Sequence, residues 1–111
     1  MPAARLFQEI IATYQRHGWR LRRVLCRSQA QASIKALANE LFGDTVINQA
    51  DFDALWFARP SHAGREAWEL RLVAEQPYAL FEAFEADETE EEREEARREM
   101  EARMRDYLKR T

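Results

Sequence analysis

The sequence predicts a single α+β domain, residues 1–111, in which an antiparallel sheet of three or four strands packs against two or three helices. Two observations carry this prediction. Apolar residues recur at helical spacing in three segments, and two strand-like segments flank the turn-rich residues 60–65, as in a β-hairpin. The 111 residues are 46% hydrophobic and include only three Gly and three Pro, which is typical of one folded domain.

The chain is predicted to begin with a helix over residues 4–17. Its apolar stripe consists of Leu6, Phe7, Ile10, Ile11 and Tyr14. Gly18 follows where a helix C-terminus favours a left-handed residue. Residues 19–27 then predict a strand whose arginines lie on both sides of the ribbon.

A second helix is predicted over residues 29–42, after Ser28 and Gln31, which resemble a capping box. Its apolar set consists of Ile34, Leu37, Ala38, Leu41 and Phe42, and Gly43 ends the run. Residues 43–51 are predicted to be a connection with a brief apolar patch at Val46 and Ile47.

The β-hairpin is predicted from residues 52–59 and 66–73. In its second strand Trp68, Leu70 and Leu72 face one way, whereas Glu69 and Arg71 face the other. The first strand has no clean polar face, so the sequence leaves two registers open.

In the first register paired residue numbers sum to 125, which places Phe57 opposite Trp68 and leaves Trp56 on the outer face beside Glu69. In the second they sum to 124, which places Trp56 opposite Trp68 and Phe57 outside with Leu55. Both registers expose a large apolar side chain.

Residues 78–85 fit either a strand or a helix. As a strand they place Tyr78, Leu80 and Phe84 on one face and Phe81 on the other. As a helix they begin with Pro77 in the first turn, where proline is also acceptable. Spacing from the hairpin favours the strand.

The final element is predicted to be a charged helix over residues 90–109, capped by Asp87 or by Thr89 with Glu92. Three pairs at four-residue spacing are expected along it: Glu94 with Arg98, Glu99 with Arg103, and Glu101 with Arg105. A thin stripe is expected to dock on the domain: Ala96, Met100, Met104, Tyr107 and Leu108.

Charge is distributed unevenly. The net charge is −3, but residues 1–81 carry ten basic and eight acidic side chains, whereas residues 82–111 carry seven and twelve. Eight acids lie between Glu85 and Glu95. This acidic block is typical of a solvated helix start, and docking of a basic partner is the functional alternative.

The basic counterpart is a cluster in residues 19–27 that consists of Trp19, Arg20, Arg22, Arg23 and Arg27. One interpretation is an anion or nucleic-acid contact, in which an aromatic ring stacks on a base. The favoured interpretation is that these arginines neutralise the acidic final helix, within one chain or between two chains.

No catalytic motif stands out. Cys26 lies between Arg23 and Arg27, whose charge would lower the thiol pKa, so a Cys-dependent enzyme is a third hypothesis; a buried core cysteine is the favoured interpretation. His62 beside Ser61 is interpreted as an exposed loop residue. Asp44, Asp51 and Asp53 lack calcium-loop spacing, and no metal site or cofactor is predicted.

The leading functional prediction is therefore a small, non-catalytic protein-binding or self-associating domain, a homodimer with an aromatic sheet face. Trp56, Phe57 and Phe81 are its predicted contact residues. A lone cysteine, no long apolar run and no secretory pattern predict a cytoplasmic, bacterial-type protein without a membrane contact.

Overall fold

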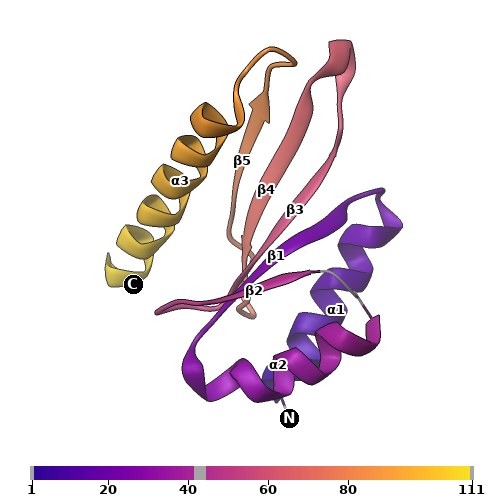
Figure 1. The fold of residues 1–111 in the computed structure, drawn as a ribbon. Coiled ribbons are helices and arrows are strands. Elements are labelled where there is room, and N and C mark those ends of the chain that lie inside the picture. Colours follow the sequence, from indigo (N-terminus) through magenta and orange to yellow (C-terminus); the bar gives the residue numbers. More distant parts are fainter. Residues whose placement is uncertain (1, 42–44, 111) are drawn as a thin grey trace.

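The computed structural model describes residues 2–41 and 45–110. Along these residues the elements are α1 (Pro2–Arg16), β1 (Arg20–Cys26), α2 (Ser28–Leu41), β2 (Val46–Gln49), β3 (Ala54–Pro60), η1 (His62–Gly64), β4 (Glu66–Leu72), β5 (Ala79–Phe84) and α3 (Glu90–Arg110). The strands form one sheet in the order β2-β1-β3-β4-β5 (Figure 1). The predicted α+β class is confirmed, but the sheet is larger than expected.

The additional strand is β2, which was predicted to be part of a connection. It runs parallel to β1, and α2 crosses between the two strands, so the sheet is mixed and not wholly antiparallel. Four residues at a sheet edge are too few to show an alternating pattern. Phe42, Gly43, Asp44 and the side chains of Leu37, Ala38 and Leu41, which the predictions included, lie outside the described residues.

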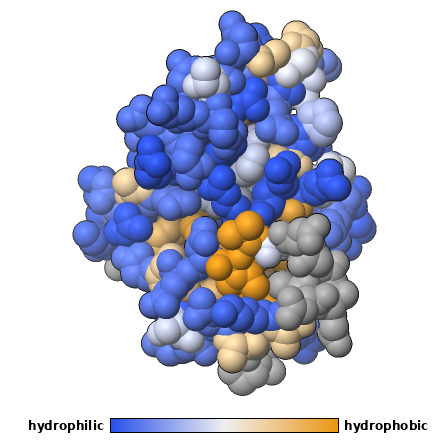
Figure 2. Space-filling model, viewed as in Figure 1, coloured by the Kyte–Doolittle hydropathy of each residue, from blue (hydrophilic) through white to orange (hydrophobic). Residues whose placement is uncertain are grey.

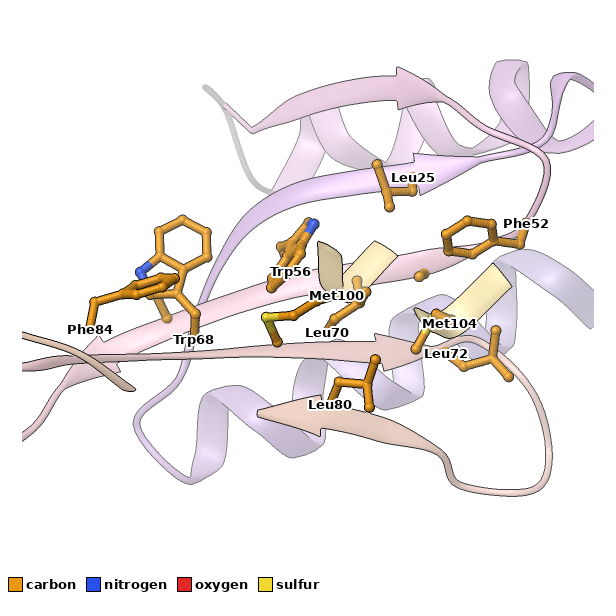
Figure 3. Close-up of a cluster of buried hydrophobic side chains, with 12 residues drawn as sticks. Leu25, Phe52, Trp56, Trp68, Leu70, Leu72, Leu80, Phe84, Met100 and Met104 are labelled. Atoms are coloured by element: carbon orange, nitrogen blue, oxygen red, sulfur yellow. The ribbon is translucent and has the colours of Figure 1, made fainter. Parts of the chain in front are cut away.

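Helices cover both faces of the sheet: α1 and α2 lie on one face and α3 lies on the other (Figure 1). The core under α1 and α2 consists of Phe7, Ile10, Ile11, Leu21, Val24, Cys26, Ile34, Leu55 and Phe57. In the core under α3, Met100 and Met104 lie over sheet side chains that include Trp56, Leu70 and Leu72 (Figure 3). The expected docking stripe of the last helix is thereby confirmed.

Both predicted hairpin registers are wrong. Trp56 lies opposite Leu70 and Phe57 lies opposite Glu69, so paired residue numbers sum to 126. The side chains of Trp56 and Phe57 are each 0% exposed, because each points into one of the two cores. Their predicted exposure is wrong for the same reason, since helices cover the sheet on both faces.

Residues 78–85 form the strand that the spacing favoured. In β5, Leu80 and Phe84 are buried under α3, whereas Phe81 points to the opposite face and is 58% exposed. Of the three predicted contact residues, Phe81 is therefore the exposed one.

The C-terminus of α1 and the N-terminus of α3 follow the predicted capping. Gly18 has φ +83° just after α1. At the start of α3 the Thr89 hydroxyl accepts from the Glu92 N–H at 3.1 Å, and the Glu92 carboxylate accepts from the Thr89 N–H at 2.8 Å.

The three ion pairs predicted along α3 are wrong. In the described structure Glu94 accepts from Arg23 and Arg97, Glu101 accepts from the Trp56 indole, and Arg105 donates to Asp51. Several charged side chains of α3 therefore contact residues of the sheet or of the segment before β3, and do not only face solvent. Across residues 2–41 and 45–110, no helix has both the length and the apolar character that a membrane crossing requires.

Candidate functional site

A β-bulge in β1 sets the direction of its arginines. The pairing of β1 with β3 shifts between Leu21 and Arg23, which leaves Arg22 as the extra residue. Regular alternation would place Arg22 and Arg23 on opposite faces, as the sequence predicted. Both guanidinium groups instead lie near the Trp68 ring, with centroid distances of 5.4 and 5.8 Å, so that prediction is wrong for this pair.

A third arginine reaches the same indole from α3. The guanidinium of Arg97 lies 3.9 Å from the Trp68 ring centroid and 5.3 Å from that of Phe84. Three cations from β1 and α3 thus surround one tryptophan, an arrangement that cation–π attraction and ion pairing stabilise together.

Arg97 is 2% exposed, which is unusual for a charged side chain. One of its terminal nitrogens, Nη1, donates to Glu90 and to Glu94, each at 2.8 Å. Its Nε is buried and has no hydrogen-bond partner among the described residues. The two carboxylates balance the buried charge, but the hydrogen-bonding capacity of the guanidinium is not fully used.

Glu94 links the β1 arginines to α3. Arg23 donates to both of its carboxylate oxygens, at 2.9 and 3.3 Å. Burial opposes ionisation of Glu94, but the hydrogen bonds from Arg23 and Arg97 outweigh it, and its pKa is lowered. The hydrogen bond from Arg97 likewise lowers the pKa of Glu90. The pairing of Arg23 with Glu94 within one chain agrees with the interpretation that the β1 arginines neutralise the acidic final helix.

These residues line a cleft of about 340 Å³ between β1, β2, β4 and the N-terminal half of α3. We call it the arginine cleft; its lining consists of Arg22, Arg23, Val46, Glu66, Trp68, Glu90 and Arg97. Within the described chain Arg22 forms no ion pair, so it is the cation of the cleft that no carboxylate neutralises.

The other members of the predicted anion-binding cluster lie elsewhere. Trp19 packs against Tyr14 and stacks under the guanidinium of Arg59, at 4.4 Å. Arg27 donates to the buried carboxylate of Asp53 at 2.9 Å. Arg20 is exposed at the start of β1. The structure therefore brings together Arg22 and Arg23, and separates Trp19 and Arg27 from them.

Cys26 is fully buried in the core under α1 and α2, as the favoured interpretation expected. Burial, with a smaller contribution from Asp53, raises its thiol pKa, which is the opposite of the effect expected from the flanking arginines. His62 is exposed in η1. Among the described residues, no group of three or more His, Cys, Asp or Glu side chains is placed to hold a metal ion.

A second surface lies on the other face of the sheet, beyond α1. We call it the open face; it consists of Glu69 and Arg71 of β4 and Ala79, Phe81 and Ala83 of β5. A groove of about 310 Å³ separates it from α1, with Leu6, Ile10 and Tyr14 on one wall. The Tyr14 hydroxyl donates to Glu69 and holds that wall to β4.

Among the residues whose exposure the structure describes, Val46 of β2 is the other large apolar side chain that is well exposed, at 52%. Figure 2 shows apolar surface where β2 crosses the molecule. Exposed apolar side chains therefore mark both edge strands of the sheet, β2 and β5.

Sequence reasoning missed Trp68 and Arg97 as parts of a site. Trp68 resembled an ordinary core residue, and Arg97 resembled one of many solvated arginines in a charged helix. The one available signal was that Arg97 lies on the helical stripe of Met100 and Met104, three and seven residues away.

Comparisons with known proteins supply no relative: no family model, no curated protein and no solved structure matches this chain. Functional assignment therefore depends on the two surfaces described above.

Proposed function

We propose that this chain is a self-associating domain that forms a homodimer through the edge strand β5. The observation that carries the proposal is Phe81, a large aromatic side chain that is 58% exposed in the middle of an edge strand. Within the described chain β5 pairs only with β4, so its outer backbone groups can pair with another strand.

The residues of β5 are self-complementary. When two β5 strands meet antiparallel around a twofold axis, Phe81 can lie opposite Phe81 of the second copy, and Ala79 opposite Ala83. A symmetric register centred on the neighbouring Glu82 places two carboxylates opposite each other, which is unfavourable. Charge and shape therefore both favour the register centred on Phe81.

This pairing extends the sheet to ten strands and joins the open faces of two copies. Each copy also brings its α1 groove, with an apolar wall at Leu6, Ile10 and Tyr14, on the same face of the sheet as Phe81. Backbone pairing supplies affinity, and the aromatic pair supplies register.

The first test is the solution mass by light scattering. We expect a mass of twice 13.1 kDa that persists at high salt, because the contact is mainly apolar and backbone-mediated. Phe81→Glu is expected to give a monomer. The matched control is Val46→Glu on the other edge strand, which is expected to leave the dimer intact. A wild-type monomer, or a dimer lost only in Val46→Glu, would overturn the proposal.

A second test addresses the register without removing Phe81. In a Cys26→Ala background, Ala79→Cys with Ala83→Cys is expected to form two disulfides across the axis and give a covalent dimer under oxidation. Ala79→Cys alone is the control and is expected to stay uncrosslinked, because its partner position is then alanine.

A further inference from the structure

We infer that the arginine cleft binds a small molecule through an oxyanion group, a phosphate or a carboxylate. The group would sit between Arg22, which has no ion pair, and the guanidinium of Arg97, and it would take the place that the Glu90 carboxylate now occupies. This site is distinct from the β5 edge and does not depend on dimer formation.

Three features of the cleft support an anion. Arg22, Arg23 and Arg97 converge on it. The carboxylates of Glu66, Glu90 and Glu94 pair with Arg93, Arg97 and Arg23, so that within the described chain Arg22 is left without an ion pair. Arginine forks suit the geometry of carboxylate and phosphate oxygens. Arg97, which lines the cleft, also has a buried Nε without a partner within the described chain, so its guanidinium has unused hydrogen-bonding capacity.

Glu90 behaves as an internal substitute for such a ligand. It is the first residue of α3, and its side chain is 72% exposed, yet it reaches seven residues along the helix to Arg97 at 2.8 Å. Because the side chain is mostly solvated, it can rotate away at little cost, whereas Glu94 is held by both Arg23 and Arg97.

The size and charge of the surroundings favour a small ligand over a polyanion. The cleft of about 340 Å³ falls within the range of small-molecule sites. Val46 and Trp68 offer apolar surface beside the cations. The first turn of α3 carries Glu90, Glu91 and Glu92, which would repel the extended phosphate chain of a nucleic acid.

The experiment follows the indole N–H signals of the three tryptophans by NMR during titration at constant ionic strength. Inorganic phosphate and acetate are the probes, in separate arms, to distinguish the two oxyanions. The Trp68 signal reports on the cleft, because its indole donates to Glu66 at 2.7 Å. Trp19 packs against Arg59 outside the cleft and serves as the internal reference. We expect a saturable shift of the Trp68 signal with at least one probe.

Two variants test the assigned roles. Arg22→Gln is expected to weaken binding about tenfold, because one charge-assisted hydrogen bond is lost. Glu90→Gln is expected to strengthen binding about threefold, because an exposed competing carboxylate is removed. Arg98→Gln is the matched control: the residue is exposed on the same helix, and the affinity is expected to stay unchanged.

Two results would overturn the inference. One is a linear, unsaturable drift of all three indole signals with both probes, which indicates general salt effects. The other is an equal loss of affinity in Arg22→Gln and Arg98→Gln, which would show that binding depends on the net charge of the protein and not on the arginine cleft. Circular dichroism of each variant confirms that the fold is retained, and Arg22 is exposed, so its substitution leaves the cores intact.

Discussion

The two faces of the sheet are covered by helices of different character. On one face α1 buries Phe7, Ile10 and Ile11, so the contact is almost entirely apolar. On the other face α3 buries Met100 and Met104 together with a charged residue, Arg97. A helix this rich in charge docks because its arginines and carboxylates have partners on the sheet, whereas α1 docks mainly by hydrophobic burial.

The contacts of α1 and those of α3 should respond differently to pH and salt. Apolar burial under α1 is insensitive to pH and to moderate salt. The contacts of α3 include exposed and half-buried ion pairs, which salt screens and acid removes. The α3 side should therefore weaken first when either condition changes.

The largest expected effect comes from the adjacent core residues Trp56 and Phe57, one in each core. Alanine at either position is expected to lower the free energy of unfolding by about 3–5 kcal/mol, because each side chain is fully buried. Urea denaturation measures this. Phe81→Ala, at an exposed position, is the control and is expected to change the unfolding free energy of the isolated chain by less than about 0.5 kcal/mol.

A loss below about 1 kcal/mol in Trp56→Ala would mean that α3 does not close this face in solution. The indole of Trp56 also donates to Glu101 at 2.9 Å, so its removal leaves a carboxylate of α3 without that partner. Amide hydrogen exchange separates the two cores: Trp56→Ala should accelerate exchange in α3 more than in α1.

The order of the main elements could be predicted because each carries a local signal. The stripe of α1 and the capping pair of α3 act within a few residues, and the structure confirms both. β2 has only four residues and gains its identity from pairing with β1, so its sequence carries no comparable signal.

The hairpin register could not be predicted, because register is encoded by a contrast between a polar and an apolar face. In β3 the residues Ala54–Ala58 are all buried, since helices cover both faces, and this contrast is absent. The arginine cleft could not be predicted for a related reason. A bulge at Arg22 and a contact between β1 and α3 create it, and neither appears in local spacing.

A smaller effect is expected from the ion pairs that hold α3. Glu94→Gln should lower the free energy of unfolding by about 1–3 kcal/mol, because Glu94 accepts three hydrogen bonds from Arg23 and Arg97 and is partly exposed. Glu99→Gln, at an exposed position of the same helix, is the control. Equal effects of the two variants would contradict the role given to Glu94.

The carboxylates of Glu90 and Glu94 should also make stability depend on pH. The folded-state pKa values of Glu90 and Glu94 lie below the ordinary value of 4.5. Their contribution is therefore fully present above pH 4.5 and is lost as the pH falls through the folded-state values. Wild type should lose more stability than Glu94→Gln over this acidic interval. If the free energies of unfolding of the two proteins fell in parallel with pH, Glu94 would not be the cause of the acid sensitivity.

The smallest effect concerns a polar contact between α1 and the sheet, the hydrogen bond from Tyr14 to Glu69. Tyr14→Phe removes the hydroxyl that donates to Glu69, and should cost about 0.5–1.5 kcal/mol, because Glu69 is near enough to solvent for water to replace the lost donor. The phenol is a neutral donor at neutral pH, and burial, followed by the hydrogen bond to Glu69, raises its pKa further. The cost should therefore be the same at low and high salt. A cost that falls with salt as steeply as that of Glu94→Gln would show that α1 also depends on electrostatics, and the contrast between the two faces would not hold.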